Sequence, residues 1–130
     1  MIVYCDSSAL LKRVIDEAGA ADTRAQIQQF VSSGAAVATS ALGELEVSRV
    51  CRGYFGQGGL DDARVALQDI AILEISKVVL RSAADIPARY LRSTEAIHVA
   101  SAFTIRANLV LTSDRQMRAA CTELGMLVGP

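Results

Sequence analysis

Five short apolar runs alternate with stretches of helical periodicity along this chain. The runs lie at residues 2–5, 35–38, 70–75, 109–112 and 126–128. Short runs that are apolar throughout are typical of strands buried on both faces of a parallel sheet. The alternation therefore predicts an α/β fold, a three-layer α/β/α sandwich around a mostly parallel central sheet.

The segments between these runs carry the apolar stripes of amphipathic helices. The first three helices are expected to begin at polar capping residues, namely Ser7 or Ser8, Asp22 and Ser40. The first is expected to end near Gly19, and the glycine-rich segment 53–59 is expected to break the third and act as a flexible hinge. Later helices are predicted at 61–68, up to the interruption at Asp85-Ile86-Pro87, from Thr94, and at 115–124.

Composition favours one compact domain spanning residues 1–130. Of the 130 residues 52% are hydrophobic, Trp is absent and 5% are aromatic, so the core must be built from Val, Leu, Ile and Ala. Met1 leads directly into a predicted strand, and no apolar run approaches the length of a membrane span. Neither secretion nor membrane insertion is expected.

Three cysteines are widely spaced in the chain: Cys5, Cys51 and Cys121. Their odd number and the absence of a CxxC pair argue against a disulfide framework or a zinc site. We expect them to be reduced, buried packing residues of a cytoplasmic protein.

Four acidic residues stand where predicted strands or helices begin or end: Asp6, Glu46, Glu95 and Asp114. Asp6 and Asp114 each follow an apolar run, so two strand ends bring carboxylates to the same edge of a parallel sheet. Ligands of open α/β sheets bind in the crevice outside that edge, and oxygen-only ligand sets suit Mg2+ or Mn2+. Such ions hold carboxylates that otherwise repel one another, and they activate water against phosphate esters. The pattern predicts a metal-dependent enzyme acting on phosphate esters.

The same residues allow other interpretations. Asp114 can cap the helix that follows it, and Glu44 competes with Glu46 for a place in the site. His98 lies one helical turn from Glu95, although a hydrogen-bonded helix histidine is its commoner state. Hydroxyls near the acids can bond metal-bound water or cap helices: Ser7, Ser8, Thr112 and Ser113.

The charge balance does not mark a basic nucleic-acid-binding protein. The chain has 13 Lys and Arg against 14 Asp and Glu, a net charge of −1. Basic residues nevertheless accompany each acid in the sequence, namely Lys12, Arg13, Arg49, Arg52, Arg92, Arg115 and Arg118. A basic rim around an acidic centre would hold a polyanionic backbone, and solvated helix faces explain the same residues equally well.

Four segments together resemble the PIN domain family, and in particular VapC-type toxins of bacterial toxin–antitoxin pairs. They are VYCDSSAL at 3–10, SALGELEV at 40–47, LRSTEAIHVASA at 91–102 and LVLTSD at 109–114. The resemblance covers essentially the whole chain, with the motifs in the family's order and spacing.

This resemblance implies a Mg2+- or Mn2+-dependent endoribonuclease, typically a homodimer, that is silenced by a small VapB-type antitoxin whose tail enters the active-site groove. It assigns the catalytic and metal-binding roles to Asp6, Glu46, Glu95 and Asp114, and so selects Glu46 over Glu44. It also implies that the helical region after Glu46, which carries Val47, Val50, Tyr54 and Phe55 beside the glycine-rich segment, meets the antitoxin or a second subunit.

The third acid departs from the family pattern, because Glu95 stands where the family usually has Asp. The extra methylene shifts a carboxylate by on the order of 1.5 Å, and a misplacement near 1 Å can cost roughly a hundredfold in rate. Weak or altered activity is therefore one expectation from the sequence.

Other function classes fit less well or stay open. A PIN nuclease of RNA maturation outside any toxin pair, and an inactive domain that only binds a partner, remain open alternatives. A phospho-acceptor signalling domain needs an acceptor Asp after the central strand, whereas the run at 70–75 is followed by Ser76-Lys77. A phosphatase of the haloacid dehalogenase type needs Asp where Ser8 stands.

Overall fold

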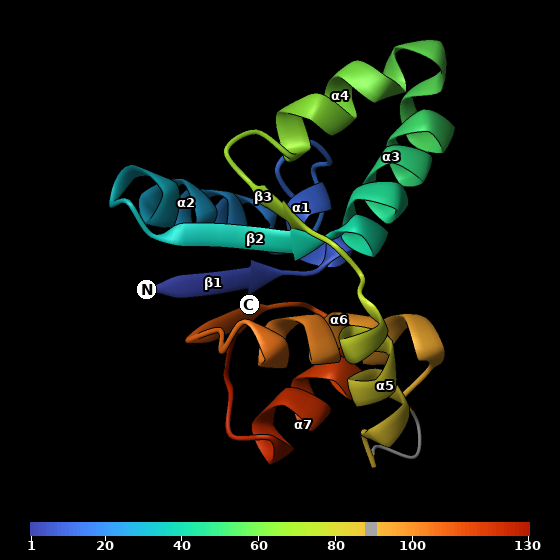
Figure 1. The fold of residues 1–130 in the computed structure, drawn as a ribbon. Coiled ribbons are helices and arrows are strands. Elements are labelled where there is room, and N and C mark those ends of the chain that lie inside the picture. The colour runs from blue at the N-terminus through green and yellow to red at the C-terminus, as the bar shows by residue number, and fades with distance from the viewer. Residues whose placement is uncertain (88–90) are drawn as a thin grey trace.

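The computed structural model describes residues 1–87 and 91–130, and its centre is a five-stranded sheet in the order β3-β2-β1-β4-β5. All four strand pairs are parallel. The predicted α/β/α sandwich is confirmed, and the sheet is fully rather than mostly parallel (Figure 1). The strands are β1 Ile2–Cys5, β2 Ala36–Ser40, β3 Ala71–Leu73, β4 Leu109–Leu111 and β5 Leu127–Gly129.

The strand order reverses beside the central strand. The chain adds β2 and β3 on one side of β1 and then returns to add β4 and β5 on the other. Tyr4 of β1 is in register with Ala38 of β2 and with Val110 of β4. In open α/β sheets a crevice forms outside the carboxyl ends of the strands at such a reversal. In this chain the reversal lies between β1 and β4.

Helices cover both faces of the sheet (Figure 1). On one side are α1 Ser7–Leu11, α2 Ala20–Ser32, α3 Ala41–Phe55 and α4 Gly59–Ala66, with a short 3-10 turn, η1 Gly56–Gly58, between the last two. On the other are α5 Lys77–Asp85, α6 Ser93–Thr104 and α7 Arg115–Glu123. Among the helices of the part described, none is long and apolar enough to cross a membrane.

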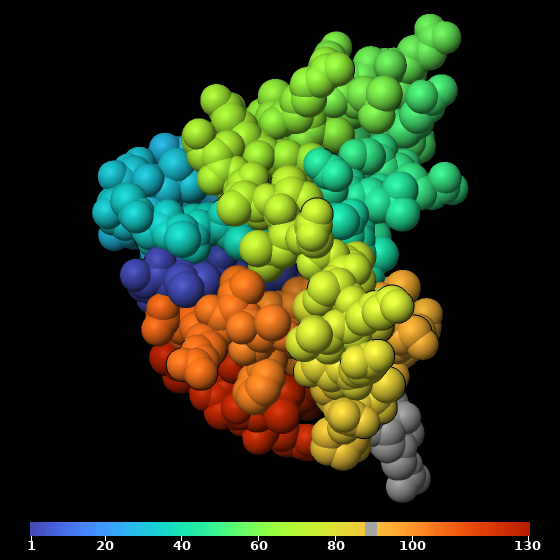
Figure 2. All heavy atoms as spheres, viewed as in Figure 1, coloured from blue at the N-terminus to red at the C-terminus, as the bar shows by residue number. Residues whose placement is uncertain are grey.

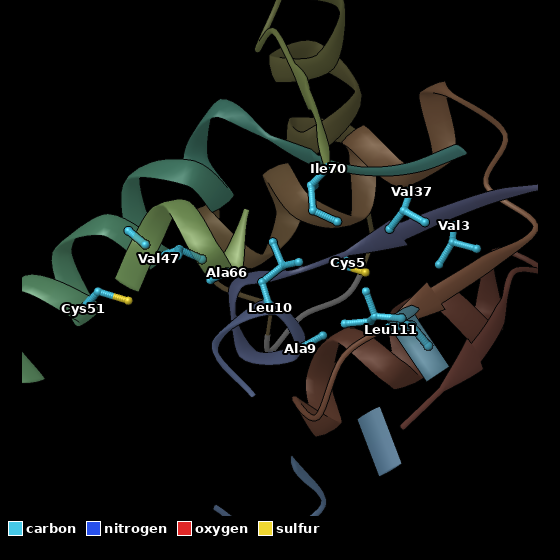
Figure 3. Close-up of a cluster of buried hydrophobic side chains, with 12 residues drawn as sticks. Val3, Cys5, Ala9, Leu10, Val37, Val47, Cys51, Ala66, Ile70 and Leu111 are labelled. Atoms are coloured by element: carbon cyan, nitrogen blue, oxygen red, sulfur yellow. The ribbon is translucent and has the colours of Figure 1, made fainter. Parts of the chain in front are cut away.

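Alternation along β1 divides the core into two clusters. Val3 and Cys5 face the side of α1 to α4, whereas Tyr4 faces α6 and α7. Figure 3 shows the first cluster running from the sheet to Val47 and Cys51 of α3. All three cysteines are free and buried, as the sequence predicted.

Several helix boundaries differ from the predictions. The N-cap of α1 is Asp6 rather than Ser7 or Ser8, because the Asp6 carboxylate accepts the backbone N–H of Ala9. The α-helix stops at Leu11 instead of near Gly19, since the next turn uses tighter i to i−3 bonds. Helix α2 begins at Ala20, ahead of Asp22.

Helices α3 and α4 form a pair that projects from the sheet, which we call the α3–α4 arm (residues 41–66; Figures 1 and 2). Ser40 caps α3 as predicted, but the helix continues through Gly53 and ends only at Gly56, which has φ +75°. A side chain at Gly59 would lie 2.2 Å from the Cys51 carbonyl oxygen, so glycine lets α4 pack directly against α3. Within the glycine-rich segment Gly59 is buried against α3, whereas the 3-10 turn before it is exposed; the predicted hinge stays a prediction.

Candidate functional site

Asp6 lies directly after the central strand, at the point where the strand order reverses, and is only 3% exposed. Its Oδ1 accepts the Ser8 hydroxyl at 2.6 Å and the Ala9 N–H at 3.0 Å, and its Oδ2 accepts the Thr112 hydroxyl at 2.5 Å. Burying a carboxylate is costly unless it is hydrogen-bonded, and these donors fix both of its oxygens.

Two hydroxyls join the ends of β1 and β4. Thr112 donates to Asp6 and accepts the backbone N–H of Asp114 at 3.0 Å. Ser8 donates to Asp6 and accepts the backbone N–H of Ser113 at 3.1 Å. The loops that carry the two strand-end acids are therefore held together as one rigid unit.

Asp114 caps α7, because its Oδ1 accepts the Met117 N–H at 2.9 Å. The capping role that the sequence left open for Asp114 is thus present. Its backbone also contacts the Thr112 hydroxyl that holds Asp6. Asp114 consequently belongs to the same unit as Asp6.

Lys12 is buried beside this unit. Its Nζ lies 3.2 Å from Glu17 Oε1, 3.4 Å from the Ser8 carbonyl oxygen and 3.4 Å from Ser113 Oγ. The ion pair with Glu17 places a fixed positive charge next to the strand-end acids.

Glu46 enters the site from α3 and meets a histidine from α6. Its Oε1 lies 2.5 Å from His98 Nε2, and His98 Nδ1 lies 2.7 Å from the Tyr4 hydroxyl. His98 is 3% exposed and Tyr4 is fully buried, whereas the Glu46 side chain is 32% exposed. Glu44 is exposed and lines a pocket between α3 and α4, so Glu46 is the acid that faces α6.

Burial raises the pKa of Tyr4 to about 12, although nearby hydroxyls of Ser40, Thr39 and Ser101 oppose the rise. The phenol is therefore protonated at neutral pH and has a hydrogen to donate. A carboxylate only accepts, so His98 Nε2 donates to Glu46, and in the neutral ring Nδ1 accepts from Tyr4.

Glu95 lies in the first turn of α6. Its Oε2 accepts the backbone N–H of Arg92 at 2.8 Å. A Glu at this third helical position commonly reaches back to the residue before the helix and satisfies an otherwise unpaired donor. Glu95 therefore caps the start of α6, and this role occupies one of its two carboxylate oxygens.

The four acids take part in three hydrogen-bonded arrangements: Asp6 with Asp114 through Thr112, Glu46 with His98, and Glu95 with the Arg92 N–H. Across residues 1–87 and 91–130 no three His, Cys, Asp or Glu side chains converge as a metal-binding group. The donor set is nevertheless chemically suited to a hard divalent cation, since it consists of carboxylate oxygens. Glu46, Glu95 and Asp114 each use one carboxylate oxygen in a hydrogen bond to the part of the chain that is described. The second oxygen of each is available to bind a cation. Binding one ion through three of the acids requires side-chain rotation from this arrangement.

The PIN domain sequence model matches residues 3–123. This chain belongs to the PIN domain family. Among curated relatives of this PIN domain, ribonuclease VapC47 of Mycobacterium tuberculosis is 34% identical over 128 residues, covering 97% of this chain and 94% of the relative. Ribonuclease VapC46 of the same species is 31% identical over 128 residues, covering 97% and 95%.

Solved structures agree on the fold. VapBC2 from Rickettsia felis, bound to a promoter DNA fragment, superposes on this PIN domain with a TM-score of 0.77 and 9% identity, covering 99% of this chain and 98% of that one. VapC20 of Mycobacterium tuberculosis, a sarcin–ricin loop cleaving toxin, gives 0.71 and 13% identity, covering 91% and 94%. At these identities the likeness concerns the fold.

The basic residues near the acids divide into two groups. Arg13 and Arg118 support the fold of the PIN domain, since Arg13 bonds the Ala66 and Gln68 carbonyl oxygens and Arg118 those of Thr112 and Gly129. The exposed ones are Arg49, Arg52, Arg92 and Arg115. Only this second group is available to form a basic rim.

Sequence reasoning missed two participants. Tyr4 is the one aromatic residue in the apolar run at 2–5, which ends just before Asp6. A tyrosine hydroxyl in a buried strand usually has a hydrogen-bond partner, so its presence there could have indicated a polar contact near the site. Gly43 packs against Thr39 and His98, and nothing in the local pattern around it indicated that contact.

Proposed function

We propose that this chain is a metal-dependent endoribonuclease and the toxin of a VapBC-type toxin–antitoxin pair, acting in the cytoplasm. The observation that carries the proposal is the buried Asp6 carboxylate at the strand-order reversal, held by Ser8 and Thr112 and joined to Asp114. Family membership adds to it, because relatives of the same length are named ribonucleases.

Mg2+ or Mn2+ is the proposed cofactor, with Asp6, Glu46, Glu95 and Asp114 as the residues that would hold it. Bound there, such an ion would supply charge neutralisation for the phosphodiester and a more acidic water. The chain's own contribution is positioning. Hydrogen bonds from Thr112 and Ser8 fix Asp6, and Lys12 places a positive charge at Ser8 and Ser113 of the two loops.

The proposed substrate is RNA, approached over the exposed arginines of the rim. Arg92 precedes Glu95 and Arg115 follows Asp114, so each lies next to an acid of the site. Cations around an acidic centre attract the phosphate backbone without reading its sequence. Cleavage is accordingly expected to weaken as the salt concentration rises.

The proposed partner is a small VapB-type antitoxin that docks on the α3–α4 arm. Structures similar in fold include VapBC complexes from Rickettsia felis and Haemophilus influenzae. The arm exposes five large apolar side chains that offer apolar area to a partner, namely Leu45, Val50, Tyr54, Leu60 and Val65. Val47, which was expected at the same surface, is instead fully buried in the core, so that part of the expectation is wrong. A homodimer, also expected from the resemblance, stays a prediction.

The test is cleavage of total RNA by the purified chain with Mg2+ or Mn2+, and after removal of metal with a chelator. Asp6→Asn and Asp114→Asn are expected to abolish metal-dependent cleavage, roughly a hundredfold loss or more. Asp16→Asn is the matched control, since Asp16 is exposed and outside the site. Full cleavage by both site variants, at matched metal concentration and with intact folds, would overturn the assignment.

A binding domain of low catalytic activity is the second candidate. The observation that favours it is the Glu95 side chain, which is engaged by the Arg92 N–H. This candidate predicts that the wild-type chain captures the antitoxin encoded by the adjacent gene yet cleaves RNA no faster than Asp6→Asn.

A further inference from the structure

The carboxylate of Glu46 is the end of a hydrogen-bonded chain that begins in the core. Tyr4 of the central strand contacts His98 of α6 at 2.7 Å, and His98 contacts Glu46 of α3 at 2.5 Å. The three residues come from three different elements, so the chain ties the sheet, α6 and α3 together at the edge where the acids lie.

We propose that Tyr4 and His98 are positioning residues that set the orientation of the Glu46 carboxylate for cation binding. The inference rests on the proposed function, because it takes Glu46 as one of the ligands. Glu46 is the most exposed of the three residues, with a side chain that is 32% exposed on a helix of the projecting arm. A long, half-exposed Glu side chain can adopt several rotamers. A hydrogen bond from His98 to one carboxylate oxygen favours the rotamer that keeps this contact.

His98 is well suited to this task because its own ring is fixed at three places. Tyr4 holds Nδ1, Glu46 occupies Nε2, and the Tyr4 ring meets the imidazole edge-on with centroids 5.9 Å apart. The His98 side chain is also almost completely buried, with 4% of it exposed. Its Nε2–H therefore points in one direction, and the Glu46 oxygen that accepts it has a defined place.

Backbone packing adjusts the same contact. Gly43 lies one turn before Glu46 on α3, and a Cβ there would stand 2.1 Å from Thr39 Oγ1 and 3.4 Å from His98 Cε1. Glycine at this position lets α3 approach β2 and α6 closely enough for Glu46 to reach His98.

The test is Mn2+ affinity by titration calorimetry, with the folded state checked by circular dichroism and thermal melting. Loss of an outer partner of a metal ligand typically lowers metal affinity about 10- to 100-fold. We expect a loss of Mn2+ affinity of this size for His98→Asn and His98→Ala. For Tyr4→Phe we expect a loss of about threefold to tenfold, because the His98 ring loses its contact at Nδ1 but is still present. His98→Gln is the rescue variant, because its amide nitrogen stands where Nε2 does and still donates to Glu46.

Rescue separates positioning from mere packing. His98→Gln and His98→Asn both remove the ring, so a packing role predicts equal losses, whereas a positioning role predicts that only Gln retains affinity. Thr104→Ala is the matched control, since Thr104 lies on the same helix and its hydroxyl donates to the Ala100 carbonyl oxygen, away from Tyr4 and Glu46. In a Glu46→Gln background, Tyr4→Phe should produce no further loss, because its effect passes through Glu46.

The outcomes distinguish the inference from the proposed function. If the wild-type chain binds Mn2+ and folded Tyr4→Phe and His98→Asn bind it within twofold of wild type, the positioning role is wrong and the nuclease proposal stands. If the wild-type chain binds no Mn2+, both are overturned. Where His98→Ala fails to fold, Tyr4→Phe and the Gln and Asn pair decide the question.

Discussion

Thr112 and Asp6 lie 106 residues apart in the chain, yet the Thr112 hydroxyl donates to Asp6 Oδ2 at 2.5 Å in a fully enclosed position. The same hydroxyl accepts the Asp114 N–H. One oxygen atom therefore fixes two of the proposed acids across the strand-order reversal.

Thr112→Val keeps the shape of the side chain and removes this hydroxyl. It leaves an unpaired carboxylate oxygen and an unpaired N–H, so the free energy of unfolding should fall by about 1–3 kcal/mol. RNA cleavage should fall at least about tenfold, because Asp6 loses a constraint. Urea unfolding and a cleavage assay measure the two effects. Thr112→Ser should retain both properties, and Thr122→Val, at an exposed hydroxyl that donates within its own helix, is the control.

Glu95 combines a capping role with a proposed ligand role, and substitution separates them. Glu95→Gln keeps an acceptor for the Arg92 N–H but removes the charge, so stability should change by less than about 0.5 kcal/mol while cleavage falls. Glu95→Asp should keep or raise cleavage, because it restores the side-chain length usual in the family. Melting curves and cleavage rates are compared with Glu44→Gln, a charge removal at an exposed acid. Unchanged cleavage and metal affinity in both Glu95 variants would remove Glu95 from the site.

Gly43→Ala tests the close approach of α3. The added Cβ would meet buried Thr39, so the helix must shift, at a cost of about 1–3 kcal/mol in the free energy of unfolding. Cleavage should fall as well, because Glu46 moves with the helix. Gly53→Ala on the same helix is the control of opposite sign: its Cβ meets nothing within 4 Å, and it should stabilise by about 0.5–1 kcal/mol.

The α3–α4 arm is predicted to bind the antitoxin. Tyr54→Lys should lower the affinity for the antitoxin at least about tenfold while RNA cleavage is retained, because an exposed aromatic anchor is lost. Val78→Lys on α5 is the matched control, since both side chains are 64% exposed. Calorimetry with the purified antitoxin measures the difference. A larger loss for Val78→Lys would place the contact on α5 instead.

The sequence predicted what depends on local pattern. All five strands and the arrival of Asp6 and Asp114 at one sheet edge followed from apolar runs and their polar ends. The contact between Glu46 and His98 did not, because it spans 52 residues and depends on how α3 crosses α6. The early end of α1 was also missed. Arg13, just beyond that end, contacts the Ala66 and Gln68 carbonyl oxygens, a long-range contact that no periodicity reveals.

Alkaline stability should report on the buried phenol and thiols. Burial raises the pKa of Tyr4 from 10.0 to about 12 and that of Cys121 from 9.0 to about 11, and it also raises the pKa of Cys5. A group that holds its proton more tightly when folded contributes stability that is complete below its unfolded pKa and is lost as the pH rises toward the folded value.

Unfolding free energies should therefore be flat with respect to these groups up to about pH 9 and decline from there to about pH 12. The loss of unfolding free energy that comes from Tyr4 begins near pH 10 and amounts to about 2–3 kcal/mol by pH 12. Tyr4→Phe has no proton to lose, so its free energy of unfolding should decline less steeply than that of the wild type above pH 10, although its stability at pH 7 is lower because His98 loses a donor. Urea unfolding at a series of pH values measures both profiles. Parallel profiles above pH 10 would show that the Tyr4 phenol ionises as readily in the folded chain as in the unfolded one, and would contradict the pKa rise that its burial causes.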